Sequence, residues 1–387
     1  MLIEVHMLQN HAPSNLNRDD TNSPKSCVFG SVRRSRISSQ CIKRSIRQSV
    51  YFKDLFNEEY ASYRTRKLPQ LIASGLIDKG ISEDKAKDIA KVFEDLGKNK
   101  EKKDKKEGEK EKKPKRELET SQIMFFSSLE VKMIIEELYK RLKNENKSIT
   151  LKDIEQIFSK NRLQNITPDI ALFGRMITSD VFMNVEASMQ VAHAISTNKL
   201  ETEFDFFTAV DDLVSSKDLD NLGAGMIGDT EFNSSCYYKY FSLDVDGFEN
   251  NLKQDLSSEE LKNIIRKSVD AFLKSAIFVT PTGKQNSFAA NQLPDGILIE
   301  FRTIKTPISY ANAFLKPCSG TYKKDLMETS IERFIEHVHT MNNKFNLLSS
   351  KRLWFTTKDY VMPGTEQCQD INELINTSLD QIKISKS

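Results

Sequence analysis

The chain has 387 residues, 38% of them hydrophobic, and its 57 basic and 55 acidic side chains leave a formal net charge of only +2. This length predicts one large domain with insertions, or two domains, with a sizeable core. No apolar run approaches the ~20 residues of a membrane span. The N-terminal stretch MLIEVHMLQNHAPS has no basic region before an apolar one, so we expect no signal peptide, no membrane contact and a cytoplasmic protein.

The cysteines and histidines form no metal-binding pattern. The five cysteines are odd in number and widely spaced, which suits reduced thiols, and no CxxC occurs. The five histidines offer no HExxH, and His337 and His339, two apart, would lie on different faces of a helix. We therefore expect no structural zinc site and no cofactor.

The first predicted elements are a strand, a polar loop and a helix. LIEVHML (2–8) has the length and apolarity of a buried strand. A loop rich in Asn, Asp, Ser and Pro follows over 10–27. Ser38 or Ser39 then suits a helix N-cap. From Gln40 the apolar residues recur with helical spacing, at Ile42, Ile46 and Val50.

Residues 54–165 have a mostly helical pattern. Apolar residues with a period near 3.6 recur at Ala86, Ile89, Ala90, Phe93 and Leu96. The stretch 98–116 has eleven bases, five acids and almost no apolar residue, so it predicts a disordered loop. Its net charge is 11 − 5 = +6, and the rest of the chain therefore sums to 2 − 6 = −4. A basic surface on the folded part therefore requires basic residues that cluster in one region, because the folded part as a whole is slightly acidic.

The second half predicts further strands and helices. FNSSCYYKYFSLDVD (232–246) is typical of a long aromatic strand, and Ser257 with Glu260 makes a capping box for the next helix. The strand GILIEFRT, a helix near 326–345, the strand RLWFTT and a short terminal helix complete the chain. Without its insertions the order predicts an α+β fold on the ferredoxin-like βαββαβ plan, with helices on one face of an antiparallel sheet.

Three short motifs favour plain structural interpretations. GAGMIG (223–228) matches GxGxxG, but no strand precedes it and no helix follows, so a turn or a close backbone contact is the better interpretation. TPTGKQNS (280–287) fails the P-loop pattern, although Lys284 in this loop remains a candidate for a phosphate or a base edge. In DVD (244–246) two carboxylates on one strand face indicate a solvated strand end more than a metal pair.

The strongest signal is the stretch SNLNRDDTNSPKSCVFGSVRRSRISSQCIKRSIRQS (14–49). It holds eight basic side chains against two acids. A helix N-terminus attracts anions, Lys43 and Arg47 extend the positive charge by one turn, and Arg36 precedes the cap. The alternative is a basic decoration of an amphipathic helix. Since the rest of the fold is slightly acidic, we favour a nucleic-acid contact that follows several phosphates.

Asp19 and Asp20 in the same loop have two interpretations. They are candidate metal ligands, or they shape the loop beside Arg18 through Asx turns. We prefer loop shaping.

Longer motifs give a resemblance to a known family. The segment 14–47, together with ALFGRMITSD, VEASMQVAHAIST, DFFTAVDDL, GAGMIG, EFNSSCYYKY, PTGKQNSFAA and ISYANAF, resembles the CasC family. Members are backbone subunits of the type I-E CRISPR surveillance complex, Cascade. The likeness covers most of the chain in order, but not 98–116 or the tail beyond about 360.

The resemblance implies a right-hand shape with four parts. The ferredoxin-like, or RNA-recognition-motif-like, palm comprises 1–53, 166–194 and 226–360. Helical fingers comprise 54–165, with the disordered basic loop 98–116, and a thumb hairpin comprises 195–225. A C-terminal helix or tail comprises 361–387.

It also implies roles for particular residues. The guide-backbone contacts are Arg18, Lys25, Ser38, Gln40, Lys43, Arg44 and Arg47, to which we add Arg36, Lys284 and Arg175. Met176 wedges against a base. Phe206, Phe207 and Thr208 displace a flipped nucleotide, and Phe206 stands where related members have Trp. On the fingers, Lys140, Lys143 and Lys147 are candidates for a non-specific contact with duplex DNA, against the alternative of a solvated helix face.

The expected function is a non-catalytic scaffold for guide RNA. The implied partners are crRNA, target DNA, further copies of the chain and the other Cascade subunits. These are the large and small subunits, the subunit that caps a guide end, the crRNA-processing endonuclease and a recruited nuclease-helicase. One alternative is a metal-dependent ribonuclease that uses Asp19 or Asp20, and another is a basic protein–protein module without nucleic acid.

Overall fold

The computed structural model describes residues 1–54, 61–96, 117–144, 149–159, 166–177, 181–209, 226–253 and 256–382. The chain forms two compact units. Unit 1 comprises Met1–Phe52, Met189–Val245 and Val269–Ser385, and unit 2 comprises Lys53–Ser188, Asp246–Ser268 and Lys386–Ser387. Two stretches that we assigned to the palm, 166–188 and 246–268, thus fall in unit 2.

A large sheet forms the centre of unit 1. Its order is β12-β11-β10-β1-β9-β7-β3-β2, and β6 and β8 also pair with β9. The long strands are β1 (Leu2–Ser14) and β9 (Met226–Asp244). The remaining strands are β2 (Ser26–Phe29), β3 (Val32–Ile37), β6 (Met189–Val191), β7 (Ala194–Ser196), β8 (Glu203–Ala209), β10 (Gly296–Arg302), β11 (Lys351–Thr356) and β12 (Glu366–Gln367).

The central strands of this sheet belong to two strand–helix–strand units, one from β1 to β6 and β7 and the other from β9 to β10. β1 pairs antiparallel with β10 on one side and with β9 on the other, and β9 pairs antiparallel with β6 and β7. Helix α1 (Ser39–Gln48) lies in the chain between β1 and β6, and α9 (Ser258–Phe278) lies between β9 and β10. The fold is thus a mixed α+β fold, as the sequence predicted.

Helices cover both faces of the sheet, which also contains one parallel pair, β11–β12, so the prediction of helices on one face of an antiparallel sheet is wrong for the sheet as a whole. On one face α11 (Leu326–Phe345) places Ile331 and Phe334 in a core with Leu8, Tyr238 and Trp354. On the other face the Phe272 ring of α9 packs edge-on against Phe241 at 5.4 Å between centroids. The smaller elements are α2 (Val50–Lys53), α10 (Gln285–Phe288), the 3-10 helix Ala311–Phe314 and α12 (Ile371–Asp380).

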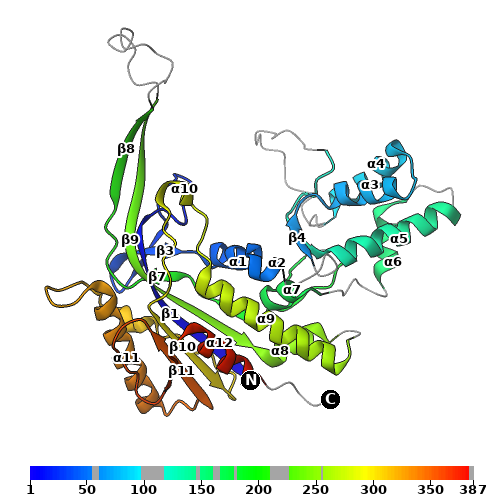
Figure 1. Ribbon diagram of the computed structural model, residues 1–387. Helices are drawn as coiled ribbons and strands as arrows, with labels where there is room; N and C mark the ends of the chain where they lie inside the picture. Colours follow the sequence, from blue (N-terminus) through cyan, green and yellow to red (C-terminus); the bar gives the residue numbers. More distant parts are fainter. Residues whose placement is uncertain are drawn as a thin grey trace, which may run out of the picture. The chain divides into compact units, whose positions relative to one another are not determined.

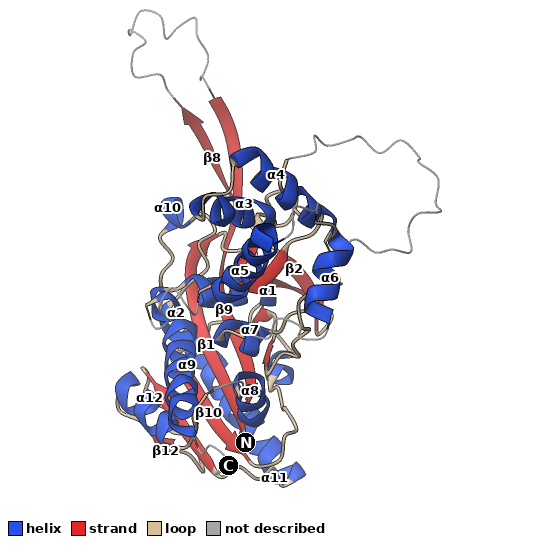
Figure 2. Ribbon diagram, turned by 90° about the vertical axis from the view of Figure 1, so that its right-hand side faces the viewer, coloured by secondary structure: helices blue, strands red, loops and turns tan. Residues whose placement is uncertain are grey.

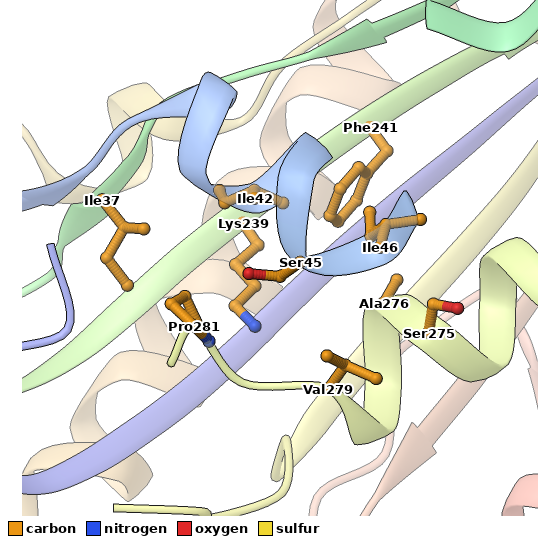
Figure 3. A pocket seen from close by; sticks show the side chains of 10 residues that line it. All are labelled: Ile37, Ile42, Ser45, Ile46, Lys239, Phe241, Ser275, Ala276, Val279 and Pro281. Carbon is orange, nitrogen blue, oxygen red and sulfur yellow. The ribbon is translucent and has the colours of Figure 1, made fainter. Parts of the chain in front are cut away.

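A small cavity of about 10 Å³ lies between α1, α9 and β9, and Figure 3 shows the side chains that line it. Its wall is mostly apolar, with Ile42, Ile46 and Val279 among the lining residues. Lys239 of β9 runs beneath α1 toward Pro281 and is only 4% exposed. Burial lowers the pKa of its amine to about 8, because desolvation disfavours the charged form.

Strands β8 and the first part of β9 form a hairpin that extends beyond the other strands of unit 1, as Figures 1 and 2 both show. The register joins Glu203 with Phe232 and Ala209 with Met226. Beyond Phe232, β9 pairs with β1 instead, from Asn233 with Ser14 to Asp244 with Leu2. Strand β8 lies in the segment that we predicted as the thumb, 195–225, whereas its partner residues 226–232 fall in a stretch that we assigned to the palm. Residues 210–225 lie outside the described part.

Unit 2 has its own core, built mainly by helices. The helices of this unit are α3 (Leu68–Asp78), α4 (Glu83–Lys91), α5 (Ser128–Asn144), α6 (Leu151–Ser159), α7 (Pro168–Phe173), α8 (Val245–Leu252) and the first part of α9, with the 3-10 helix Val92–Asp95. The residues that we placed on a helical stripe, among them Ala86, Ile89 and Phe93, are buried in this core. A two-stranded sheet of β4 (Ser62–Thr65) and β5 (Met124–Ser127) was not predicted. The predicted loop 98–116 lies outside the described residues.

Two local predictions are settled by the structure. The capping box is confirmed, because Glu260 N donates to Ser257 Oγ (3.3 Å) and Ser257 N donates to the Glu260 carboxylate (3.0 Å). The prediction that Asp244 and Asp246 share a strand face is wrong, because β9 ends at Asp244 and Asp246 already belongs to α8.

Candidate nucleic-acid interface

The polar loop after β1 is held in shape by Asp19. Its Oδ1 accepts from Thr21 N and Ser23 N, both at 3.0 Å, and from Thr21 Oγ1 at 2.8 Å. The bond from the Thr21 hydroxyl contributes most to lowering the pKa of this exposed carboxyl. Lys25 N also donates to Asn17 O (2.8 Å), which closes the loop at its base. The loop-shaping interpretation of Asp19 is confirmed.

The same loop is fastened to the start of α1. Ser38 is the N-cap, and its Oγ accepts from Cys41 N at 3.3 Å, as the sequence predicted. The Ser38 N–H donates in turn to Asn17 Oδ1 (2.8 Å). Loop and helix N-terminus therefore form one continuous surface, called here the loop–helix surface (residues 17–25 and 36–47).

Most of the predicted guide contacts lie on this surface. Ile42 and Ile46 turn the apolar side of α1 inward, so its basic residues lie toward solvent. Three of the predicted residues are exposed, namely Arg18, Gln40 and Arg44. Four are half-buried, namely Lys25, Arg36, Lys43 and Arg47, and Ser38 is buried.

The positive charge of this surface acts on the pKa values of two neighbouring side chains, His193 and Cys41. Arg36 Nη1 lies 3.0 Å from His193 Nδ1, and the pKa of His193 is lowered, first by burial and then by Arg36 and Lys25. Burial raises the pKa of the Cys41 thiol, while Lys25 and Arg44 act to lower it. Cations from the loop, β3 and α1 thus act on common neighbours, which is the arrangement that attracts an anion of several charges.

Arg34 belongs to the same basic stretch but faces inward. It is fully buried, and its guanidinium donates to six backbone carbonyls. These belong to Phe29, Ser196, Thr197, Asn198, Phe314 and Leu315. Arg34 therefore connects β3 to residues 196–198, which lead into the hairpin, and its guanidinium is not available to bind a ligand.

Lys284 lies near the hairpin rather than on α1. Its Nζ donates to Thr230 Oγ1 (3.1 Å) on β9, so the amine bonds to a protein hydroxyl. Its backbone has a φ of +50°, in the left-handed region.

The hairpin separates the predicted base-displacing residues onto its two faces. Phe206 is 67% exposed and shares a face with Thr208 and with Phe204, which is 65% exposed. Phe207, on the other face, covers Gly228, where an added Cβ would lie 2.5 Å from the ring. Gly228 of GAGMIG thus allows close approach of a side chain, whereas we predicted a turn or a close backbone contact. We did not identify Phe204, although the alternation in ETEFDFFTA indicates it.

The remaining predicted residues belong to unit 2. Met176 is 95% exposed. Arg175 is buried, and its guanidinium pairs with the Glu130 carboxylate (2.8 Å) and donates to Met183 O (2.9 Å). We therefore remove Arg175 from the candidate interface, because its guanidinium is buried and its Nε and Nη1 are bonded within unit 2, although Nη2 has no hydrogen-bond partner among the described residues. Lys140 and Lys143 are exposed on α5, and Lys147 lies outside the described residues.

Two features are absent from the described residues, a metal-binding cluster and a membrane-spanning helix. No group of three or more His, Cys, Asp or Glu side chains is placed to hold a metal ion. Among the same residues, no helix is both long and apolar enough to cross a membrane.

Comparison with known structures defines the class of protein. A chain titled "CRISPR RNA-guided surveillance complex, pre-nicking" matches at a TM-score of 0.78 and 26% identity, over 98% of this chain and 99% of that one. A second, titled "CRISPR RNA-guided surveillance complex", has a TM-score of 0.59, 21% identity and the same coverage, and supports the fold alone. The predicted resemblance to subunits of CRISPR surveillance complexes is thus confirmed.

The family follows from the sequence comparison. The model described as "CT1975-like protein" matches residues 3–381, so the chain belongs to the CT1975-like protein family. No curated protein matches the chain.

Proposed function

We propose that the chain is a guide-RNA-binding backbone subunit of a type I-E CRISPR surveillance complex. Several copies line one crRNA and present it for pairing with target DNA. The observation that carries this proposal is the loop–helix surface, where cations from the loop, β3 and α1 lie together in a chain of this family.

The central strands support a ferredoxin-like palm. The order β10-β1-β9-β6/β7, antiparallel at each step, is the order of that plan when α1 and α9 are its two connecting helices. This makes β8–β9 an insertion between the second and third strands of the plan, which is where a thumb belongs. Unit 2 supplies the fingers.

The two kinds of contact divide the work. Phosphate contacts from Arg18, Lys25, Lys43, Arg44 and Arg47 hold the strand without reading its sequence, which suits a subunit that serves many guides. Phe206 and Met176 are exposed apolar side chains that wedge between bases, and unstacking costs a few kcal/mol per step but fixes a kink. Base pairing with the target then supplies specificity.

We propose no catalytic step. Asp19, one candidate for a nuclease, has its Oδ1 engaged by three donors within its own loop. The complex acts in the cytoplasm, and its nuclease-helicase, large and small subunits, end-capping subunit and processing endonuclease carry out the remaining steps.

The test is RNA binding by the Lys43→Ala/Arg47→Ala variant as a function of salt. Losing two phosphate contacts should reduce the slope of log K against log salt by about 1.4, at roughly 0.7 per contact on a single strand. Lys344→Ala is the matched control, because Lys344 is an exposed base near the end of α11, which covers the opposite face of the sheet. An unchanged affinity and slope in the double variant would contradict the proposal.

A further inference from the structure

Residues 281–292 form a segment between α9 and β10, called here the strap, that touches both the end of β1 and the base of the hairpin. We propose that the strap, together with Asn15, fixes the hairpin to the loop–helix surface, with Asn15 and Gly283 as positioning residues. This inference rests on the proposed function, because it concerns how the aromatic side chains of the hairpin are held in place relative to the loop–helix surface, which binds the phosphates in that proposal.

One side of the strap is bonded to β1. Gln9 Nε2 donates to Gln292 O (2.5 Å), and Ala12 N donates to Gln292 Oε1 (3.2 Å). The imidazole Nδ1 of His11 lies 3.3 Å from Ala290 O. Gln285 Nε2 donates to Pro281 O (3.1 Å) and Ala290 O (3.3 Å), which joins the two ends of the strap.

The other side of the strap is bonded to the hairpin. Lys284 Nζ donates to Thr230 Oγ1 at 3.1 Å. The Phe288 ring packs against Phe232 at 5.6 Å between centroids. Thr230 pairs with Asp205 of β8, and Phe232 pairs with Glu203. Both contacts therefore hold the end of the hairpin that lies nearest to the sheet.

Asn15 completes the connection from the loop. Its side chain is 1% exposed, and Nδ2 donates to Glu231 O (2.9 Å) on the hairpin and to Asn22 O (3.0 Å) in the basic loop. Because one buried amide bonds both segments, a shift of either segment leaves a buried donor unsatisfied, which destabilises the shifted arrangement.

Gly283 sets how closely the strap approaches. A Cβ at this position would lie 2.3 Å from Leu16 O and 2.8 Å from Asn15 O, which are backbone atoms that cannot rotate away. The one-turn helix α10 is bounded by Lys284 and Ala289, both non-glycine residues with left-handed φ of +50° and +48°. Such conformations persist only where surrounding contacts hold them, so the strap is a constrained piece and not a free loop.

The experiment compares Gly283→Ala with Gly320→Ala in the full chain. At Gly320 an added Cβ meets no atom closer than 3.6 Å, so this variant carries the same chemical change without the clash. Hydrogen exchange is measured without RNA at the amides of 229–233. We expect about tenfold faster exchange in Gly283→Ala and no change in Gly320→Ala. Phe288→Ala, a gentler change at a half-buried side chain, should move the same amides in the same direction.

The second measurement is binding of a labelled single-stranded RNA at several salt concentrations. Gly283→Ala should weaken binding about tenfold with an unchanged salt slope, because no phosphate contact is removed. Unchanged exchange at 229–233 in both Gly283→Ala and Phe288→Ala would overturn the strap. If the wild-type chain bound no RNA, the proposed function would fail, while faster exchange in these variants would still support the strap as the element that fixes the hairpin.

Discussion

The loop–helix surface and the β8–β9 hairpin lie in the same unit but have opposite chemistry. The first gathers Arg18, Lys25, Arg36, Lys43, Arg44 and Arg47. The described hairpin residues, 201–209 and 226–232, contain five acids and no Lys or Arg. Their two most exposed aromatic side chains, Phe204 and Phe206, share one face, and the less exposed Phe207 lies on the other. An anionic backbone would be attracted to the first surface and repelled by the second, so under the proposed function the hairpin would stack on bases and leave the phosphates to α1.

The largest expected effect concerns Arg34, the cation that joins the two regions. Arg34→Leu removes six hydrogen bonds to backbone carbonyls, three of them buried, so we expect the free energy of unfolding to fall by about 3–5 kcal/mol. Urea unfolding measures this. Its neighbour Arg33 is exposed and bonds to Ser26 Oγ, so Arg33→Leu should change the stability by less than about 0.5 kcal/mol. Equal effects in the two variants would contradict the structural role.

The next effect tests the aromatic face of the hairpin. Phe204→Ser/Phe206→Ser should weaken RNA binding about tenfold to a hundredfold, since stacking contributes about 1–3 kcal/mol per base. The salt slope should stay constant, in contrast with Lys43→Ala/Arg47→Ala. A reduced salt slope in the phenylalanine variant would contradict the assignment of base stacking to the hairpin and phosphate contacts to the loop–helix surface. Stability should be unaffected, because both rings are exposed.

A smaller effect is expected from the acid in the basic loop. Asp19→Ala removes an acceptor of three hydrogen bonds, so the loop loses its shape and RNA affinity should fall about fivefold, near 1 kcal/mol. Asp19→Asn keeps an Oδ1 acceptor and should bind as the wild type does. The same samples, incubated with magnesium and complementary RNA, should leave the RNA intact. Cleavage that Asp19→Asn abolishes would instead indicate a nuclease.

The smallest effect is a pH dependence at His193. Burial, Arg36 and Lys25 lower the pKa of this imidazole in the free chain, and a bound phosphate beside it would raise the pKa again. Binding therefore favours the protonated imidazole, and affinity should rise about threefold as pH falls from 7.5 to 5.5. His193→Gln should lose this dependence. For stability the sign is opposite, because the lowered pKa makes the folded state weaken as pH falls below 6.5.

Local signals in the sequence predicted a good part of this molecule. The Ser38 cap, the Ser257–Glu260 box and the helix 326–345 depend on residues a few positions apart, so their patterns are visible in the chain. The Asx turn at Asp19 is equally local. The mixed α+β class followed from the order of these elements.

The partners of buried polar groups were not predictable in this way. Arg34 and Arg175 look like surface cations in the sequence, but their partners lie as many as 281 and 50 residues away. Asn15, whose amide reaches Glu231, gives no local signal. Long-range contacts decide whether a basic side chain serves the fold or a ligand, and a single sequence does not show them.

The enclosed amine of Lys239 has a practical consequence. Its pKa of about 8 leaves an appreciable fraction uncharged at neutral pH, so its reaction with an acylating reagent is limited by access more than by protonation. The apolar walls of α1 and α9 restrict that access. The labelling rate of Lys239, followed by peptide mass spectrometry, therefore measures how often α1 lifts from the sheet. A strand of RNA that grips α1 should slow this labelling, so a chemical probe from beneath the helix reports on events at its outer face.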